Sequence, residues 1–182
     1  MTHLDGKRIA IIASDYVEEP ELVKPRDMLR EGGAEVRVYS RQGEPVQAAE
    51  GDVTPTQKIE VDGTFDDLDV DEVDALVVPG GTVNADHLRM DEKAQTLVRK
   101  VAGAGKPLAV ICHGPWLLVS AGLVEGRRLT SWPSLADDIR NAGGSWVDAE
   151  VVVDGTLITS RKPDDIPAFV KALEQALVGV RV

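Results

Sequence analysis

The sequence predicts an α/β fold, a three-layer sandwich with helices on both faces of a mostly parallel central sheet. Three runs rich in Val, Ile, Leu and Ala are typical of strands buried on both faces: Lys7–Ser14, Val73–Val78 and Pro107–Ile111. Helical patterns alternate with these runs, which favours parallel strands joined by helical crossovers. The 182 residues, 43% of them hydrophobic, suffice for one sizeable core, so we expect a single domain over residues 1–182.

The first strand is followed by a helix and then by a second strand. Apolar residues recur at roughly helical spacing over Glu19–Arg30, and the pair Gly32-Gly33 is a typical helix stop. Pro25 lies inside this segment, which predicts either a kink or a later helix start. Alternating apolar and polar residues then predict a strand at Glu35–Ser40.

The middle of the chain opens with an irregular segment. Gln42–Phe65 is rich in Gly, Pro, Thr and Asp and predicts short excursion strands, of which Lys58–Val61 has the strongest pattern. After the strand Val73–Val78, one apolar face runs along Asn84–Ala104 and predicts a long helix. After the strand Pro107–Ile111, a short helix is expected over Gly114–Ala121.

The last third predicts a short strand, a short helix, a hairpin and a closing helix. Asp154-Gly155 is a strong type I′ turn signal between two short β-rich runs. The elements expected here are, in order, the strand Leu129–Trp132, the helix Pro133–Asn141, the hairpin strands Glu150–Val153 and Thr156–Ser160, and the helix Asp164–Val178.

Composition excludes several classes of function. The formal net charge is -11 and no basic stripe is present, which argues against nucleic acid as a partner. No apolar run suits a signal peptide or a membrane span, and the single cysteine excludes an internal disulfide and a thiolate zinc site, so we expect a reducing cytoplasm. The three histidines lack metal-binding spacing and no glycine-rich dinucleotide motif follows a strand, so we expect neither metal nor cofactor.

The one cysteine stands where a strand is expected to turn into a helix. In the stretch AVICHGPW, Cys112 follows a buried strand, Gly114 relieves crowding and Pro115 suits the first helical turn. A nucleophile elbow exposes a reactive side chain in this way, and nearby backbone N–H groups would lower the thiol pKa. A small, inert core cysteine is the alternative.

Two other loops should meet Cys112 at the same edge of the sheet. Ligands of α/β sheets bind beyond the carboxyl ends of the strands. Asp15–Glu18 follows the first strand, and Gly80-Gly81 follows Val73–Val78. We therefore expect these loops and Cys112 to form one site.

Several blocks of the sequence resemble one known family. AVICHGPWLLVSAGLVEGRRLTSW is similar to the nucleophile region of the PfpI family of intracellular peptidases and stress proteins. Three further blocks resemble it in the same order, namely YVEEPELVKPRDMLREGGAEV, FDDLDVDEVDALVVPGGTVNADHLRMDEKA and NAGGSWVDAEVVVDGTLITSRKPDDIPAF. This family belongs to the class I glutamine amidotransferase-like superfamily, which includes the Parkinson's-associated deglycase, and the resemblance implies a flavodoxin-like fold.

The resemblance also implies roles for individual residues. Cys112 matches the nucleophile and His113 the neighbouring histidine proposed as its base. Asp86 matches an acid supplied by a neighbouring subunit, which implies a homodimer or higher homo-oligomer with a shared site. Glu18 matches the acid that touches the cysteine sulfur. Gly81 and the backbone N–H of His113 fall where the oxyanion hole lies.

Each partner also has a simpler interpretation. Glu18 could be only solvated, Asp86 only a residue at a helix start, and Gly81 only a turn residue. Trp116 and Trp132 are expected in the core or at an interface rather than under a substrate. Trp116 stands where the family often has Gln, so we expect a reshaped pocket.

The resulting expectation is a stress-protective, cysteine-dependent hydrolase of the PfpI type. Its substrate would be a peptide, or a reactive carbonyl such as a glyoxal or its protein adduct. The alternative is a redox-responsive stress protein without turnover, in which Cys112 is oxidised to sulfenic or sulfinic acid.

Overall fold

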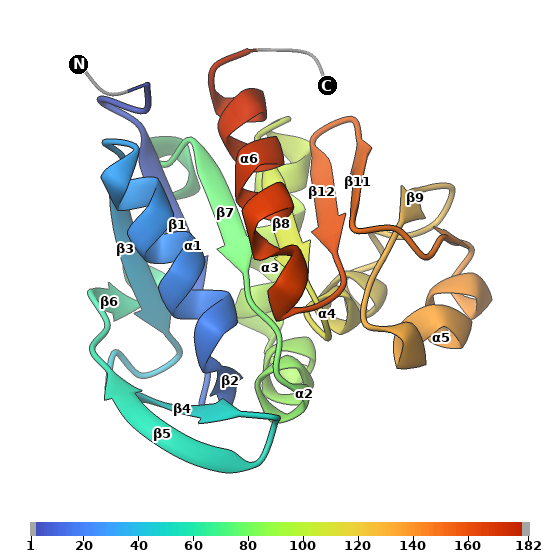
Figure 1. Ribbon diagram of the computed structural model, residues 1–182, viewed down its shortest axis with the longest axis horizontal. Helices are drawn as coiled ribbons and strands as arrows, with labels where there is room; N and C mark the ends of the chain where they lie inside the picture. The colour runs from blue at the N-terminus through green and yellow to red at the C-terminus, as the bar shows by residue number, and fades with distance from the viewer. Residues whose placement is uncertain (1–2, 180–182) are drawn as a thin grey trace.

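The computed structural model describes residues 3–179. Its main sheet has seven strands in the order β11-β12-β8-β7-β1-β3-β6 (Figure 1), and only the pair β11–β12 is antiparallel. The strands are β1 Arg8–Ile12, β3 Glu35–Ser40, β6 Gly63–Thr64, β7 Ala75–Val78, β8 Leu108–Ile111, β11 Val151–Asp154 and β12 Leu157–Ser160. The apolar runs that predicted strands are therefore the central strands, which confirms the mostly parallel sheet.

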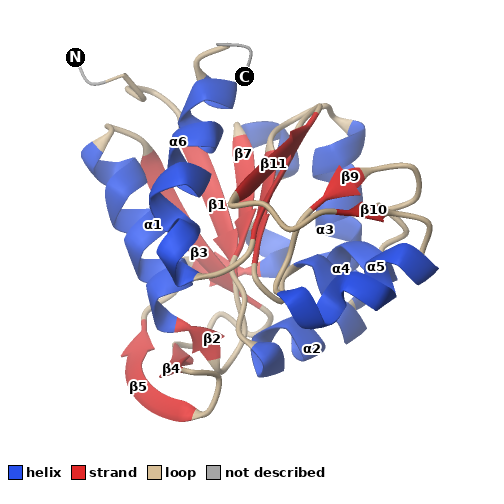
Figure 2. Cartoon of the chain, turned by 45° about the vertical axis from the view of Figure 1, so that its right-hand side comes forward, coloured by secondary structure: helices blue, strands red, loops and turns tan. Residues whose placement is uncertain are grey.

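Helices cover both faces of this sheet. Helices α1 (Glu19–Glu31) and α6 (Ile166–Leu177) pack on one face, where Leu22 and Phe169 are fully buried. Helices α3 (Glu92–Gly103) and α4 (Pro115–Ser120) bury Val98 and Leu117 against the other. Figure 2 shows the sheet between these two helical layers. The structure thus confirms the expected three-layer sandwich.

The predicted long helix Asn84–Ala104 is wrong, because two helices occupy this segment. Helix α2 (Thr82–Met90) ends at Asp91, whose backbone is extended. The Asp91 carboxylate accepts hydrogen bonds from the N–H groups of Lys93 and Ala94 and so starts α3. One apolar face continues across the break, which is why periodicity did not reveal it.

The irregular segment contains a projecting hairpin. Strands β4 (Val46–Glu50) and β5 (Thr54–Ile59) pair antiparallel, and β2 (Val17–Glu18) pairs with β4 (Figure 1). The predicted strand Lys58–Val61 overlaps only the end of β5. Five of the six residues of β5 are exposed, so hydrophobic alternation could not define its start.

The remaining connections follow the turn signals. Asp154-Gly155 joins β11 to β12, with Gly155 at φ 63°, as predicted. Helix α1 begins at Glu19 and runs through Pro25, so the helix does not start late. Short 3-10 turns at Pro133–Leu135 and Pro163–Asp165 precede α5 (Ala136–Asn141) and α6.

A small two-stranded sheet lies beside α5. Strands β9 (Arg128–Leu129) and β10 (Ser145–Trp146) pair in parallel, so the predicted strand Leu129–Trp132 begins earlier and is shorter than expected. Across residues 3–179, no helix combines the length and apolar character needed to cross a membrane.

Candidate active site

Cys112 occupies a strained turn between β8 and α4. Its φ of 61° lies in the left-handed region, which costs a non-glycine residue about 1–3 kcal/mol. The turn is held by the Cys112 N–H, which donates to the Ser160 carbonyl at 3.0 Å, and by the Trp132 N–H, which donates to the Cys112 carbonyl at 2.8 Å. A Cβ on Gly114 would lie 2.8 to 3.0 Å from Val110 and two carbonyls, so this turn requires glycine there. The elbow predicted from AVICHGPW is present.

His113 is in contact with the thiol through one ring nitrogen. Its Nδ1 lies 3.3 Å from the Cys112 Sγ, and its Nε2 lies 3.3 Å from the Thr82 Oγ1. The ring stacks on Trp132 at a centroid distance of 5.9 Å and meets the edge of Trp116 at 5.4 Å. Burial lowers the pKa of His113, and the nearby carboxylate of Asp52 acts in the opposite direction.

Two backbone N–H groups converge on the sulfur, those of Gly81 and His113. Gly81 has a φ of 91°, and a Cβ there would stand 2.5 Å from the Tyr16 carbonyl oxygen and 2.7 Å from the Glu18 nitrogen. Only glycine can place the Gly81 amide in this position. Both groups predicted for the oxyanion hole therefore lie at Cys112.

The acid beside the thiol is Glu21 and not Glu18, which corrects the sequence-based expectation. Glu21 is fully buried, its Oε2 accepts the Gly80 N–H at 2.7 Å, and its carboxyl group lies beside the side chain of Cys112. Within residues 3–179 its Oε1 is buried without a partner. Burial raises the pKa of Glu21 to about 8, above the ordinary value of 4.5.

Glu18 lies at the start of α1 and faces the β4–β5 turn. Its Oε1 and Oε2 each accept a backbone N–H at 3.0 Å, from Gly51 and Asp52 respectively. Glu18 precedes the first turn of α1, whereas Glu21 lies one turn before the buried Pro25 on the same helix face. Leu22, four residues after Glu18, is buried as well, so the i, i+4 spacing in the sequence does not distinguish the two acids.

The thiol pKa differs from the expectation. Burial raises the pKa of Cys112, and the charge of Glu21 raises it further. The amides of Gly81 and His113 lower it but do not compensate. Near pH 7 both Cys112 and Glu21 therefore carry a proton, and the thiolate forms as the thiol proton moves to a base.

Asp86 lies on α2 with its side chain exposed, and within residues 3–179 no contact joins it to His113. That the Asp86 carboxylate serves as an acid in the active site of a second subunit stays a prediction. The neighbouring His87 is also exposed, and its Nδ1 lies 2.9 Å from the Ser14 Oγ. Thr82 and Asp52 approach His113 instead, and sequence reasoning missed both.

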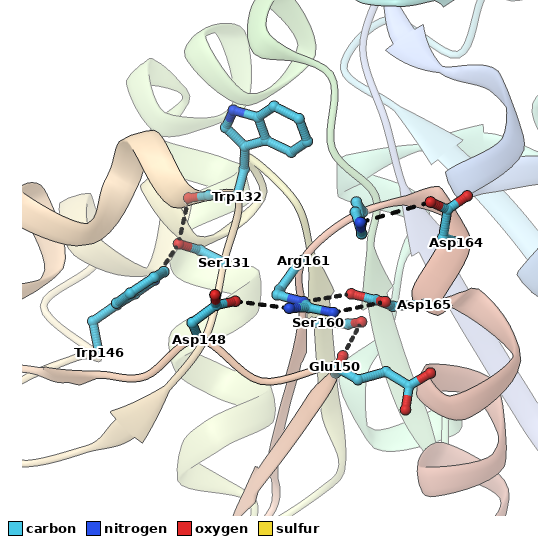
Figure 3. Close-up of polar contacts among 10 residues, drawn as sticks. Ser131, Trp132, Trp146, Asp148, Glu150, Ser160, Arg161, Asp164 and Asp165 are labelled. Atoms are coloured by element: carbon cyan, nitrogen blue, oxygen red, sulfur yellow. Dashed lines mark hydrogen bonds and ion pairs between the residues drawn. The ribbon is translucent and has the colours of Figure 1, made fainter.

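Trp132 forms one wall of the site, because its ring stacks on His113. The Ser131 Oγ donates to the Trp132 carbonyl at 2.8 Å and accepts the Trp146 Nε1–H at 2.9 Å. The indole ring of Trp132 extends away from these bonds and is 39% exposed (Figure 3). Trp116 donates its Nε1–H to Asp138 at 2.9 Å and packs under Arg89. Trp116 also packs against the buried cluster on the α3–α4 face, as expected, whereas the Trp132 ring is exposed beside His113.

No cluster of three or more His, Cys, Asp or Glu side chains suited to a metal ion occurs in residues 3–179. The site consists of a thiol, a carboxyl group, an imidazole and two amides.

The DJ-1/PfpI family pattern matches residues 7–176. The chain belongs to the DJ-1/PfpI family. It is 42% identical to a deglycase of Pyrococcus abyssi over 170 residues, which is 93% of this chain and 99% of the relative. It is 39% identical to general stress protein 18 of Bacillus subtilis and 35% identical to the putative cysteine protease YraA of the same organism, in each case over 90% of this chain and 94% of the relative.

A solved member of the DJ-1/PfpI family has the same fold. The crystal structure of DJ-1beta from Drosophila melanogaster superposes with a TM-score of 0.86 at 31% sequence identity. The superposition covers 98% of this chain and 92% of the fly protein. The resemblance proposed from the sequence is thereby confirmed for both family and fold.

Proposed function

We propose that this DJ-1/PfpI protein is a stress-protective, cysteine-dependent hydrolase that acts on small reactive carbonyls, such as glyoxals or their protein adducts. The observation that carries the proposal is the surroundings of the Cys112 sulfur. A carboxyl group, an imidazole nitrogen at 3.3 Å and two backbone amides meet at this atom. The names of relatives, deglycase and general stress protein, support the same function.

The first step is attack of the thiolate on an aldehyde carbon. His113 takes the thiol proton, the sulfur–carbon bond forms, and the carbonyl electron pair moves onto oxygen. The amides of Gly81 and His113 would stabilise this oxyanion, at about 3–4 kcal/mol for each donor. Protonated Glu21 then returns a proton to the oxygen, giving a hemithioacetal.

The second stage converts the adduct of a 2-oxoaldehyde into a 2-hydroxy acid. The hydroxyl proton of the adduct moves to the ketone oxygen, and a base moves the C–H proton of the former aldehyde carbon to the adjacent ketone carbon. The first carbon is thereby oxidised to a thioester and the second is reduced to an alcohol. Water then cleaves the thioester and restores the Cys112 thiol. The unpartnered Oε1 of Glu21 is the atom available to carry this proton.

Burial of the nucleophile favours a small substrate over a peptide. Cys112 is 5% exposed and His113 is 6% exposed, so an extended peptide has little access to the sulfur in a single chain. Peptidase activity would require the site to open, with Asp86 of a second copy completing a triad. We propose that the protein forms a homodimer or higher homo-oligomer in the cytoplasm. A site shared between two copies would then allow proteolysis as the alternative to carbonyl turnover.

Turnover of wild type and Cys112→Ala on methylglyoxal and on a fluorescent peptide library tests the proposal. We expect wild type alone to consume methylglyoxal, with circular dichroism showing that both proteins fold. Equal rates for both proteins on both substrates would refute the proposal that the protein is a cysteine-dependent enzyme. Asp86→Ala separates the two substrates, because carbonyl turnover should survive this change and a peptidase triad should not.

The free thiol also supports a redox-responsive role without turnover. Oxidation adds one or two oxygens to a cysteine, and the Gly81 and His113 amides could hydrogen-bond them. Mass spectrometry after mild peroxide treatment should show added oxygen at Cys112. An unmodified Cys112 peptide would exclude this role.

A further inference from the structure

The turn between β4 and β5 reaches the start of α2, although it lies on the projecting hairpin. Two of the three turn residues 51–53 adopt positive φ, Gly51 at 58° and Asp52 at 68°. Glu18 holds the turn by accepting the N–H groups of Gly51 and Asp52, each at 3.0 Å. The turn is therefore fixed to the loop that follows β1.

From this turn, the Asp52 carboxylate caps α2. Its Oδ1 accepts the Thr82 N–H at 2.7 Å. The N-cap residue of α2 is Gly81, which has no side chain to perform this task. No other residue type fits at Gly81, because a Cβ would meet the backbone of Tyr16 and Glu18. The carboxylate of Asp52 in the β4–β5 turn thus supplies the cap that Gly81 lacks.

We propose that Asp52 is the positioning residue of the active site, which holds the Gly81–Thr82 backbone so that the Gly81 amide meets the sulfur and the Thr82 hydroxyl meets His113. The chain of contacts is continuous. Asp52 fixes Thr82 at 2.7 Å, and the Thr82 Oγ1 lies 3.3 Å from the His113 Nε2. This inference rests on the proposed function. The resemblance implied that Asp86 of a neighbouring subunit is the acid near His113, whereas Asp52 is a carboxylate of the same chain.

The charged groups around His113 give Asp52 an electrostatic effect as well. From α1, Glu21 approaches on the Cys112 side, and from α2, Arg89 lies across the Trp116 ring. The β4–β5 turn contributes Asp52, whose carboxylate favours the protonated imidazole. Loss of the Asp52 charge should therefore lower the pKa of His113.

The test uses Asp52→Ala, which removes both cap and charge, and Asp52→Asn, which keeps a hydrogen-bond acceptor. Glu50→Gln is the matched control, because it removes an exposed acid from the adjacent strand end. We expect Asp52→Ala to reduce kcat on methylglyoxal about 10- to 100-fold with KM within about twofold, because small displacements of catalytic groups cost this much. Asp52→Asn should keep most of kcat, and Glu50→Gln should match wild type.

Two further readouts do not depend on turnover. Asp52→Ala should slow alkylation of Cys112 by iodoacetamide about threefold or more, because the Gly81 amide no longer supports the thiolate. NMR titration should show a lower His113 pKa in Asp52→Asn, which a purely structural cap would not change. A kcat and alkylation rate within twofold of wild type in Asp52→Ala, or an unchanged His113 pKa in Asp52→Asn, would overturn the proposal. If wild type itself turns over no carbonyl, the proposed function fails, and alkylation and NMR still decide the role of Asp52.

Discussion

The buried carboxyl of Glu21 should make the stability of the protein depend on pH in a specific window. Its pKa is raised to about 8 in the folded protein, whereas the unfolded chain has a value near 4.5. Between these values the unfolded chain releases a proton that the folded protein keeps, so stability falls as pH rises. Below about pH 4.5 both states keep the proton, and this group imposes no penalty.

The magnitude follows from the width of the window. Each unit of pKa difference corresponds to about 1.4 kcal/mol, so the unfolding free energy should fall by about 1.4 kcal/mol per pH unit. Over the whole window the upper limit is about 5 kcal/mol. Glu21→Gln keeps an acceptor for the Gly80 N–H and removes the ionisation, so its stability should lack this slope.

Urea unfolding of wild type and Glu21→Gln at pH 5, 6, 7 and 8 measures the effect. The unfolding free energy of Glu21→Gln minus that of wild type should increase at each step and level off near pH 8. Glu19→Gln is the control, because Glu19 is only half-buried on the same helix and its lowered pKa keeps it ionised across this range. If the unfolding free energies of wild type and Glu21→Gln change in parallel with pH, Glu21 is not a buried, protonated carboxyl group.

Three further substitutions probe the groups around Cys112. Gly81→Ala should destabilise the protein by about 2 kcal/mol or more in urea unfolding, because its φ is 91° and the added Cβ meets backbone; a loss below 0.5 kcal/mol would contradict this reasoning. Thr82→Val should lower kcat on methylglyoxal about tenfold, since the hydroxyl facing the His113 Nε2 is lost, and steady-state kinetics with unchanged kcat would exclude that role. Trp132→Ala should raise the iodoacetamide alkylation rate of Cys112 by about threefold or more, because it removes one wall of the site; an equal or slower rate would show that Trp132 does not limit access.

The sequence was informative where one residue determines its own surroundings. The buried runs predicted the central strands, and the order strand, Cys112, glycine, proline predicted the turn with a φ of 61°. The Gly81 amide could be expected at the same edge, because parallel strands end together. These features depend on local pattern and on general rules for parallel sheets.

Other features depend on contacts that no local pattern contains. Glu18 and Glu21 lie three residues apart in an acidic stretch. Only the folded helix shows that Glu18 binds the β4–β5 turn and that Glu21 is buried beside Cys112. The exposed strand β5 carries no alternation, so its hairpin turn and Asp52 could not be placed against Thr82. The break at Asp91 was hidden by a continuous apolar face.

The central claim is that a protonated Glu21 carboxyl acts beside the Cys112 thiol in a catalytic site. The most direct measurement is methylglyoxal turnover by Glu21→Gln and Glu18→Gln beside wild type and Cys112→Ala. We predict that Glu21→Gln falls at least about 100-fold, close to Cys112→Ala, because Gln has no proton to give to the oxyanion. Glu18→Gln, whose amide oxygen can still accept from the β4–β5 turn, should keep at least about a tenth of the activity. Greater loss in Glu18→Gln than in Glu21→Gln would contradict the account.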